Sequence, residues 1–227
     1  PTEMDEPDTT YYWQVEVQNS AGGDVITETF SFTTYDSAPF NTNWDYRKRI
    51  KIDHRNVQDD FEHFPVLIDI TDSDISSKAK TDGSDIMFTT DDGLTQLPHE
   101  IESYESGHVV AWVAADLSED EDTYLFVYYG NSGASNLENP EDVWDENYVM
   151  VQHLDEETGD HIDSTSNNND GTPDVSEQGT ATGKIGGADE FSSLGDTIIV
   201  SDSDSLDLTN AVTVSTWINA DTFGESD

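Results

Sequence analysis

Carboxylates and histidines are the first side chains of this sequence to consider for chemistry. The sequence contains no cysteine. That absence excludes disulfides, thiolate catalysis and Cys-based zinc sites. Glu100 and Glu102 stand two apart in a strand-like run and would share one face of the strand. Such a pair facing a sugar cleft could act as a glycosidase dyad. With Ile101 on the other face, we expect both carboxylates in solvent, and we predict no catalytic residue and no enzyme.

The histidines are not spaced as metal ligands. No two of them have the i, i+4 helical spacing of a zinc protease. For His153 we favour packing, with ligation as the less favoured alternative. The glycine-rich residues 183–187 are followed by no helical pattern, so they do not predict a phosphate-binding loop.

Aromatic side chains offer a second route to function, because exposed rings can stack on sugars. Trp112 and Trp217 lie in strongly apolar runs, where we expect them in cores. Trp44 and Trp144 flank the central region and are the predicted ligand-binding residues. Closing the ends of that region is the alternative role for both.

The charge of the chain limits its partners. Its 227 residues include 50 Asp and Glu against 8 Lys and Arg, a net charge of −42. Nucleic-acid binding needs Lys and Arg to displace counterions, and anionic membrane surfaces attract basic segments. The longest apolar run, residues 109–115, is far shorter than the roughly 20 residues that span a bilayer. We predict neither nucleic-acid binding nor membrane insertion.

The acidity itself has two interpretations. High net charge with 33% hydrophobic residues is typical of disorder. However, 10% aromatic residues and ordered apolar patterning favour a folded chain in high salt. Molar salt shortens the Debye length to about 3 Å and so screens carboxylate repulsion. The excess of 32 Asp over 18 Glu, with only 5 Lys, resembles proteins of extreme halophiles, chiefly haloarchaea.

Alternation with a period of two predicts an all-β chain of consecutive antiparallel sandwich or jelly-roll modules. Residues 11–17 and 30–33 predict a hairpin, and residues 36–43 a linker. Residues 75–80 predict one helical turn, and 212–218 a last strand. The strands expected in the central region are 47–53, 64–70, 85–89, 97–104, 108–114 and 123–129.

Three resemblances divide the chain. Residues 6–17 followed by Asn19-Ser20-Ala21-Gly22 resemble the last two strands of a fibronectin type III domain, so 1–36 would be the C-terminal hairpin of such a sandwich. Residues 43–145 resemble domain-of-unknown-function family 2341, which implies an exported protein without implying chemistry. The motifs behind this second resemblance include Trp44-Asp45-Tyr46-Arg47, Asp82-Gly83-Ser84-Asp85-Ile86, His99-Glu100-Ile101-Glu102, Ala111-Trp112-Val113, Tyr128-Tyr129-Gly130-Asn131 and Val143-Trp144-Asp145.

Residues 146–227 are similar to the first half of a concanavalin A-like, laminin-G-like jelly roll. The similarity is carried by 153–156, 163–171, 183–188, 196–200 and 212–218. In calcium-binding relatives of that fold, an acidic residue before the strand equivalent to 198–200 can ligate the ion. The resemblance therefore implies Asp196 as the candidate metal ligand and calcium as the candidate cofactor. The first and last modules are incomplete, as in a piece of a longer protein.

Together these features predict a non-catalytic, extracellular, multi-module surface protein of a halophile, acting in adhesion or glycan binding. Its partners would be cell-surface glycans or glycoproteins. One alternative is a structural subunit that binds copies of itself, in a filament or a haloarchaeal virus tail fibre or spike. A third hypothesis is an accessory region of a secreted carbohydrate-active enzyme. Fold alone does not choose among them.

Overall fold

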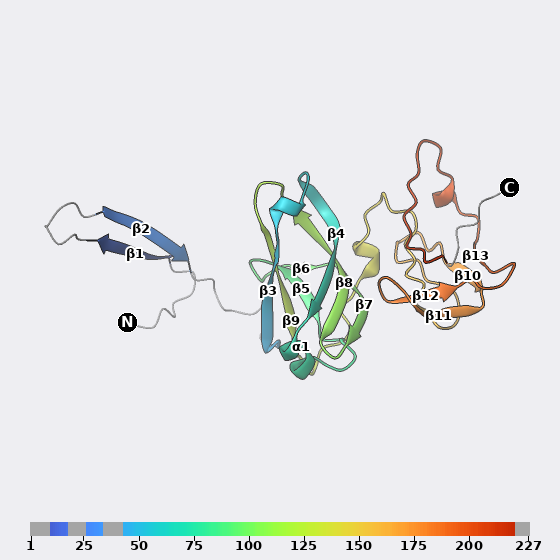
Figure 1. Ribbon diagram of the computed structural model, residues 1–227, viewed down its shortest axis with the longest axis horizontal. Coiled ribbons are helices and arrows are strands. Elements are labelled where there is room, and N and C mark those ends of the chain that lie inside the picture. Colours follow the sequence, from blue (N-terminus) through green and yellow to red (C-terminus); the bar gives the residue numbers. More distant parts are fainter. Residues whose placement is uncertain (1–9, 18–25, 34–42, 221–227) are drawn as a thin grey trace.

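The computed structural model describes the backbone of residues 10–17, 26–33 and 43–220, and the side chains of residues 43–220. Antiparallel sheets with very little helix make up its regular structure, which confirms the predicted all-β class (Figure 1). The expected hairpin is present as β1 (Thr10–Val17) and β2 (Ile26–Thr33), paired antiparallel. The predicted linker at 36–43 lies almost entirely outside the described residues.

The central module is a sandwich of two sheets. One sheet has the order β3-β9-β5-β6 and the other the order β4-β8-β7. Six of these strands correspond to the segments expected from the sequence alternation. Their bounds are β3 Tyr46–Ile52, β4 Phe61–Thr71, β5 Met87–Thr90, β6 Gln96–Leu97, β7 His99–Glu105, β8 His108–Leu117 and β9 Thr123–Tyr129.

The single strand expected at 97–104 is instead two strands in different sheets. β6 ends at Leu97 in the first sheet, and β7 begins at His99 in the second. Pro98 stands between them and has no N–H to donate to a ladder, so the chain changes sheets there. The expectation of one continuous strand was therefore wrong at this position.

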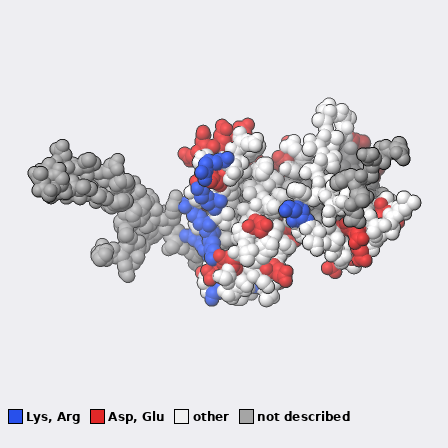
Figure 2. All heavy atoms as spheres, in the orientation of Figure 1, with Lys and Arg blue, Asp and Glu red and all other residues white. Residues whose placement is uncertain are grey.

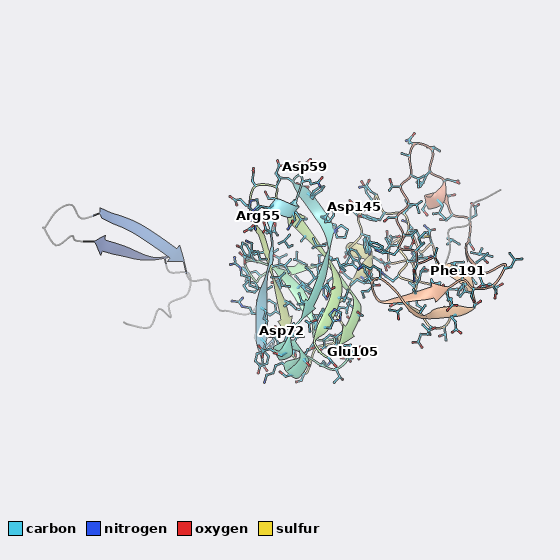
Figure 3. The ribbon with its side chains drawn as sticks, viewed as in Figure 1. Arg55, Asp59, Asp72, Glu105, Asp145 and Phe191 are labelled. Atoms are coloured by element: carbon cyan, nitrogen blue, oxygen red, sulfur yellow. The ribbon has the colours of Figure 1, made fainter. Side chains whose placement is uncertain are left out.

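The main core lies between the two sheets. Every second residue of the central strands points into it, including Phe88, Val109, Val113, Leu125 and Val127, all almost fully buried. A short helix, α1 (Ser73–Lys78), covers one end of the sandwich and buries Ile75. Figure 3 places Asp72, which caps this helix, at the same end of the sandwich as Glu105, away from Arg55 and Asp59.

A smaller cluster covers the outer face of the first sheet. Trp44, Met87, Phe126 and Tyr128 form it, with Leu137 packed against them. Asp85 fastens this region, because its buried carboxylate accepts the backbone N–H groups of Gly130 and Asn131.

Basic side chains are concentrated on one side of the sandwich. Five of the eight Lys and Arg residues of the chain lie at 47–55, and Figure 2 shows them as a band along that side. Acidic partners flank the band: Arg49 pairs with Asp91, and Lys51 pairs with Asp122. The band is therefore largely neutralised within the module.

The C-terminal part contains two small antiparallel sheets, β10-β13 and β11-β12, in long irregular segments. The strand expected around 198–200 is present as β13. The bounds are β10 Gly171–Asp174, β11 Glu177–Thr182, β12 Gly187–Glu190 and β13 Thr197–Val200.

Residues 212–218 do not form the strand predicted for them. They are exposed and form no regular structure, without a sheet partner in the described chain. Trp217 is 73% exposed, so its expected place in a core is also wrong. The alternating pattern reports a tendency to pair, but pairing needs a neighbouring strand, which the described residues do not supply.

Candidate functional site

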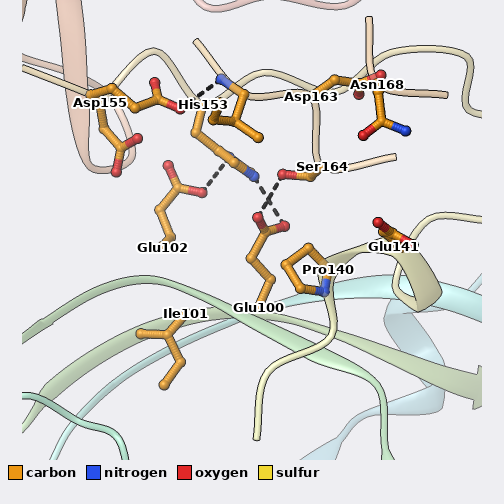
Figure 4. A pocket seen from close by; sticks show the side chains of 12 residues that line it. Glu100, Ile101, Glu102, Pro140, Glu141, His153, Asp155, Asp163, Ser164 and Asn168 are labelled. Carbon is orange, nitrogen blue, oxygen red and sulfur yellow. Dashed lines mark hydrogen bonds and ion pairs between the residues drawn. The ribbon is translucent and has the colours of Figure 1, made fainter. Parts of the chain in front are cut away.

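A pocket of about 270 Å³ opens where the outer face of the β4-β8-β7 sheet meets residues 153–168 (Figure 4). β7 forms its floor and supplies Glu100, Ile101 and Glu102. The other lining residues are Pro140, Glu141, His153, Asp155, Glu156, Ile162, Asp163, Ser164 and Asn168.

β7 places its two glutamates on the outer face of the sheet. Glu100 is paired in register with Trp112 of β8, and the Trp112 indole N–H donates to Glu102 Oε2 at 3.1 Å. The side chain of Glu102 is only 2% exposed and that of Glu100 only 11%. The expectation that both carboxylates lie in solvent was therefore wrong, because the chain after residue 145 returns over this face.

His153 lies between the two glutamates. Its Nδ1 is 2.5 Å from Glu102 Oε2, and its Nε2 is 3.1 Å from Glu100 Oε2. The second contact is an ion pair without the alignment of a hydrogen bond. His153 packs as expected from the sequence, but on an irregular segment and as an ion-pair partner.

Further contacts hold Glu100 in place. Ser164 Oγ donates to its Oε1 at 2.6 Å, and the Trp144 indole N–H donates to its Oε2 at 3.1 Å. Trp144 also packs against Trp112, with ring centroids 5.2 Å apart. The side chains around Glu100 are therefore hydrogen-bond donors, an imidazole and aromatic rings: Ser164, Trp144, His153 and Trp112.

The electrostatics follow from this packing. Burial alone would lower the pKa of His153, but its contacts with Glu100 and Glu102 outweigh burial and raise that pKa to about 10. Burial would raise the pKa of Glu100, yet His153, Ser164 and Trp144 lower it overall. Burial, Glu156 and Glu102 raise the pKa of Asp155. At neutral pH the site thus holds one imidazolium between two carboxylates.

This arrangement fixes charge more readily than it transfers protons. Both nitrogens of His153 face carboxylates, so neither offers a lone pair to a substrate. Asp155 is the lining carboxyl group with a raised pKa. These contacts hold residues 146–168 on the sandwich, and we call the three side chains Glu100, Glu102 and His153 the clamp. The small polar pocket lies beside the clamp.

A tight turn supports the clamp from behind. Asp163 accepts the backbone N–H groups of Val151, Thr165 and Asn169, and the hydroxyl of Thr165. This carboxylate positions the neighbouring Ser164 against Glu100. Residues 163–167, which belong to the range 163–171 of the jelly-roll resemblance, thus position this part of the site.

The predicted ligand-binding tryptophans are covered. Trp44 is 7% exposed and donates its indole N–H to the carbonyl of Asp85, and Trp144 is 8% exposed. A buried ring has no free face for a sugar, so the structure favours their alternative role of closing the central module.

Asp196 precedes β13 as the sequence suggests, but its contacts are those of a turn. Its Oδ2 accepts from the backbone N–H and hydroxyl of Ser176 and from the backbone N–H of Ser193. Hydrogen bonds from Ser176 and Ser193 outweigh the small effect of burial and lower its pKa. A calcium ion would have to compete with these donors.

Other Asp-rich loops also have structural partners. Asp72 caps α1 and pairs with Lys48, whereas Asp92 accepts from Leu94 and Thr90. One cluster that the sequence did not suggest, Asp53, His54 and Asp122, has metal-ligating atoms within 4.8 Å of one another. Lys51 pairs with Asp122 and Arg55 with Asp53, so cationic side chains already neutralise this cluster.

Comparison with known families bears on the segment that contains the clamp. Residues 82–170 match the family model DUF2341, a domain of unknown function. The match covers less than half of the chain and overlaps the region that the sequence motifs indicated. It includes both sides of the pocket, from Glu100 on β7 to Ser164 and Asn168. No curated protein and no solved structure matches the chain.

The glutamates and His153 were named from the sequence, but their association was missed. The available signal was the motif itself, because His99, Glu100 and Glu102 stand together in the run that carries the family resemblance. Within residues 10–17, 26–33 and 43–220, no helix is long and apolar enough to cross a membrane.

Proposed function

We propose that this chain is a non-catalytic part of an extracellular surface protein of a halophile, in which it holds successive β-modules in a fixed orientation for adhesion. The clamp carries this proposal. An ion triad whose side chains are at least 85% buried joins residues 146–168 to the sandwich, beside the tilted contact between Trp112 and Trp144. A flexible linker between independent modules would need none of these contacts.

The pocket beside the clamp supports a supplementary role in binding glycans or glycoproteins. Its carboxylates and Asn168 can accept hydrogen bonds from sugar hydroxyls, and Ile162 and Pro140 offer apolar surface. Because Trp44 and Trp144 are buried, a glycan would bind here without stacking on either ring.

Spin labels can test the fixed orientation, since the chain has no cysteine of its own. Cysteines replacing the exposed residues Glu121 and Leu194 would place one label on the sandwich and one on the C-terminal part. At pH 6 in molar salt we expect one narrow distance distribution. A control pair within the sandwich, Glu121→Cys with Glu105→Cys, sets the reference width. A much broader distribution for the first pair would contradict the proposal.

Location is tested separately by fractionating the producing cells in molar salt and identifying peptides of this chain by mass spectrometry. Peptides in the envelope fraction support a surface protein. Peptides confined to the cytoplasmic fraction would overturn that part of the proposal, whatever the spin labels show.

The second candidate function, a subunit of a filament or viral fibre, is favoured by residues 211–220. This segment contains no charged residue, is exposed throughout and has no strand partner among the described residues. Val214 and Ile218, both more than 70% exposed, could pair by strand addition with another copy. Sedimentation in molar salt tests this self-association. Oligomers that dissociate in Val214→Asp would support the filament or fibre function, and a monomer at all concentrations would exclude it.

A further inference from the structure

We propose that the clamp is operated by a proton: charged His153 holds residues 146–168 on the β4-β8-β7 sheet, and loss of its proton in alkaline solution releases them. The geometry motivates this inference. His153 bridges two carboxylates that come from the sandwich, while His153 itself belongs to the segment that is held. The inference does not depend on where the protein is located.

Among the described residues that line the pocket, His153 is the one basic side chain. The charged groups that face it from β7 are Glu100 and Glu102, and η2 (Pro140–Asp142) contributes Glu141. Its own segment contributes Asp155, Glu156 and Asp163, all acidic. The β11-β12 hairpin approaches Glu102 at Gly186, but its Lys184 is exposed and does not line the pocket. Tyr148 packs against Trp144. His161, in the same segment, faces two other acids behind the pocket: its Nδ1 is 2.7 Å from Glu156 Oε2 and its Nε2 is 2.8 Å from Asp189 Oδ2.

Removing the proton would leave several buried carboxylates without a counter-charge. An uncompensated charge is far more costly inside a protein than in water. The segment can relieve that cost by moving away, because solvent then reaches Glu100 and Glu102. Release would also expose the contact between Trp112 and Trp144.

The direction of the pH dependence follows from linkage. The pKa of His153 is about 10 in the clamped form, against an ordinary value of 6.5. Clamping is therefore fully favoured below about pH 6.5 and is lost as the pH rises through about 10. Between these limits one proton is released on opening, so the ratio of open to clamped molecules should rise about tenfold per pH unit. The lowered pKa of Glu100 predicts a second, separate loss of clamping in acid.

The test uses the full chain in molar salt, labelled at Glu121→Cys and Leu194→Cys, over pH 6 to 10.5. We expect the narrow distance population to be replaced by a broad one as the pH rises. Wherever both are populated, the ratio of broad to narrow should rise about tenfold per pH unit. His153→Gln replaces the imidazolium with a neutral amide and should abolish the slope. His108→Gln is the matched control, since His108 lies on the same sheet and pairs with Asp69 on the surface. It should keep the wild-type profile.

NMR of the His153 ring in selectively labelled protein gives an independent readout. Its titration should be shifted to alkaline pH, and Glu102→Gln should move the midpoint to lower pH because one of the two attracting charges is gone. An unchanged distance distribution up to pH 10.5 would overturn the proposal. So would an alkaline slope that persists in His153→Gln.

Discussion

At the scale of single residues, the acidic side chains of this protein divide into two kinds. Most are exposed and add to the net charge, whereas a few are buried and hold loops together. Asp85 is the clearest of the second kind, being 1% exposed. Its carboxylate accepts the backbone N–H groups of Lys80, Gly130 and Asn131, from two distant loops.

Replacing Asp85 with alanine should therefore destabilise the central module by about 3 kcal/mol, since three backbone N–H donors, one buried and two partly buried, lose their acceptor. Chemical denaturation in molar salt, followed by tryptophan fluorescence, measures the change in free energy of unfolding. Asp82→Ala is the matched control from the same loop, because Asp82 is exposed and its carboxylate accepts from the backbone N–H and hydroxyl of Ser84. We expect a loss of about 1 kcal/mol or less there. Equal losses for the two variants would contradict the assigned role of Asp85.

Sequence reasoning could not separate these two kinds of acid. Asp82 and Asp85 stand in one loop and have the same chemistry, and only the approach of residues 130–131 from the far end of the module distinguishes them. The clamp was missed for the same reason. Glu100 and His153 are 53 positions apart, and alternation within β7 describes which face a side chain takes without telling what covers that face.

At the scale of elements, sequence patterns served well where a strand finds a neighbour. β9 was predicted with its observed bounds, and the apolar run of β8 does occupy the centre of its sheet. The pattern misled at Pro98, where the chain changes sheets, and at residues 212–218, which have no partner strand in the part of the chain that the structure describes. Periodicity reports which side chains could be buried, whereas tertiary neighbours decide whether they are.

The turn between β7 and β8 shows how local sequence and packing combine. Ser106 and Gly107 have φ values of 52° and 87°, as a two-residue hairpin turn of type I′ requires. A Cβ on Gly107 would lie 2.4 Å from the carbonyl oxygen of Asp72 and 2.6 Å from the Cβ of Ser76. The turn therefore also seats the start of α1 against the hairpin.

Gly107→Ala should cost more than backbone strain alone, about 3 kcal/mol in total, because strain and collision add. Gly159→Ala isolates the first contribution: Gly159 has a φ of 86°, but a Cβ there would meet no atom within 4 Å. We expect it to cost about 1 kcal/mol. Urea denaturation of both variants measures the change in the free energy of unfolding. If Gly107→Ala lowers it no more than Gly159→Ala does, α1 moves to accommodate the extra methyl group and the predicted collision is absent.

At the scale of the whole molecule, opposite charges are distributed unevenly. Seven of the eight basic residues lie between Arg47 and Lys80. Four of them, Lys48, Arg49, Lys51 and Arg55, pair with acids of the sandwich, and Figure 2 shows the basic side chains along one side of it. Residues 146–220 contain 15 acidic residues and one basic residue, Lys184, a net charge of −14. The C-terminal part also has only two-stranded sheets, which form little core.

This asymmetry predicts that salt dilution unfolds the chain in two stages. Reducing salt from about 1 M to 0.1 M lengthens the Debye distance from roughly 3 Å to 10 Å, so carboxylates that were screened begin to repel one another. Residues 146–220 should lose protection from hydrogen exchange first, because they combine the poorer core with almost no compensating cations. The sandwich should lose protection at lower salt, where its ion pairs strengthen but its unpaired carboxylates still outnumber them.

Hydrogen exchange followed by mass spectrometry over a salt series resolves the two parts. Protection that persists in both down to 0.1 M would contradict the high-salt adaptation, and simultaneous loss would show that the clamp joins them into one cooperative unit.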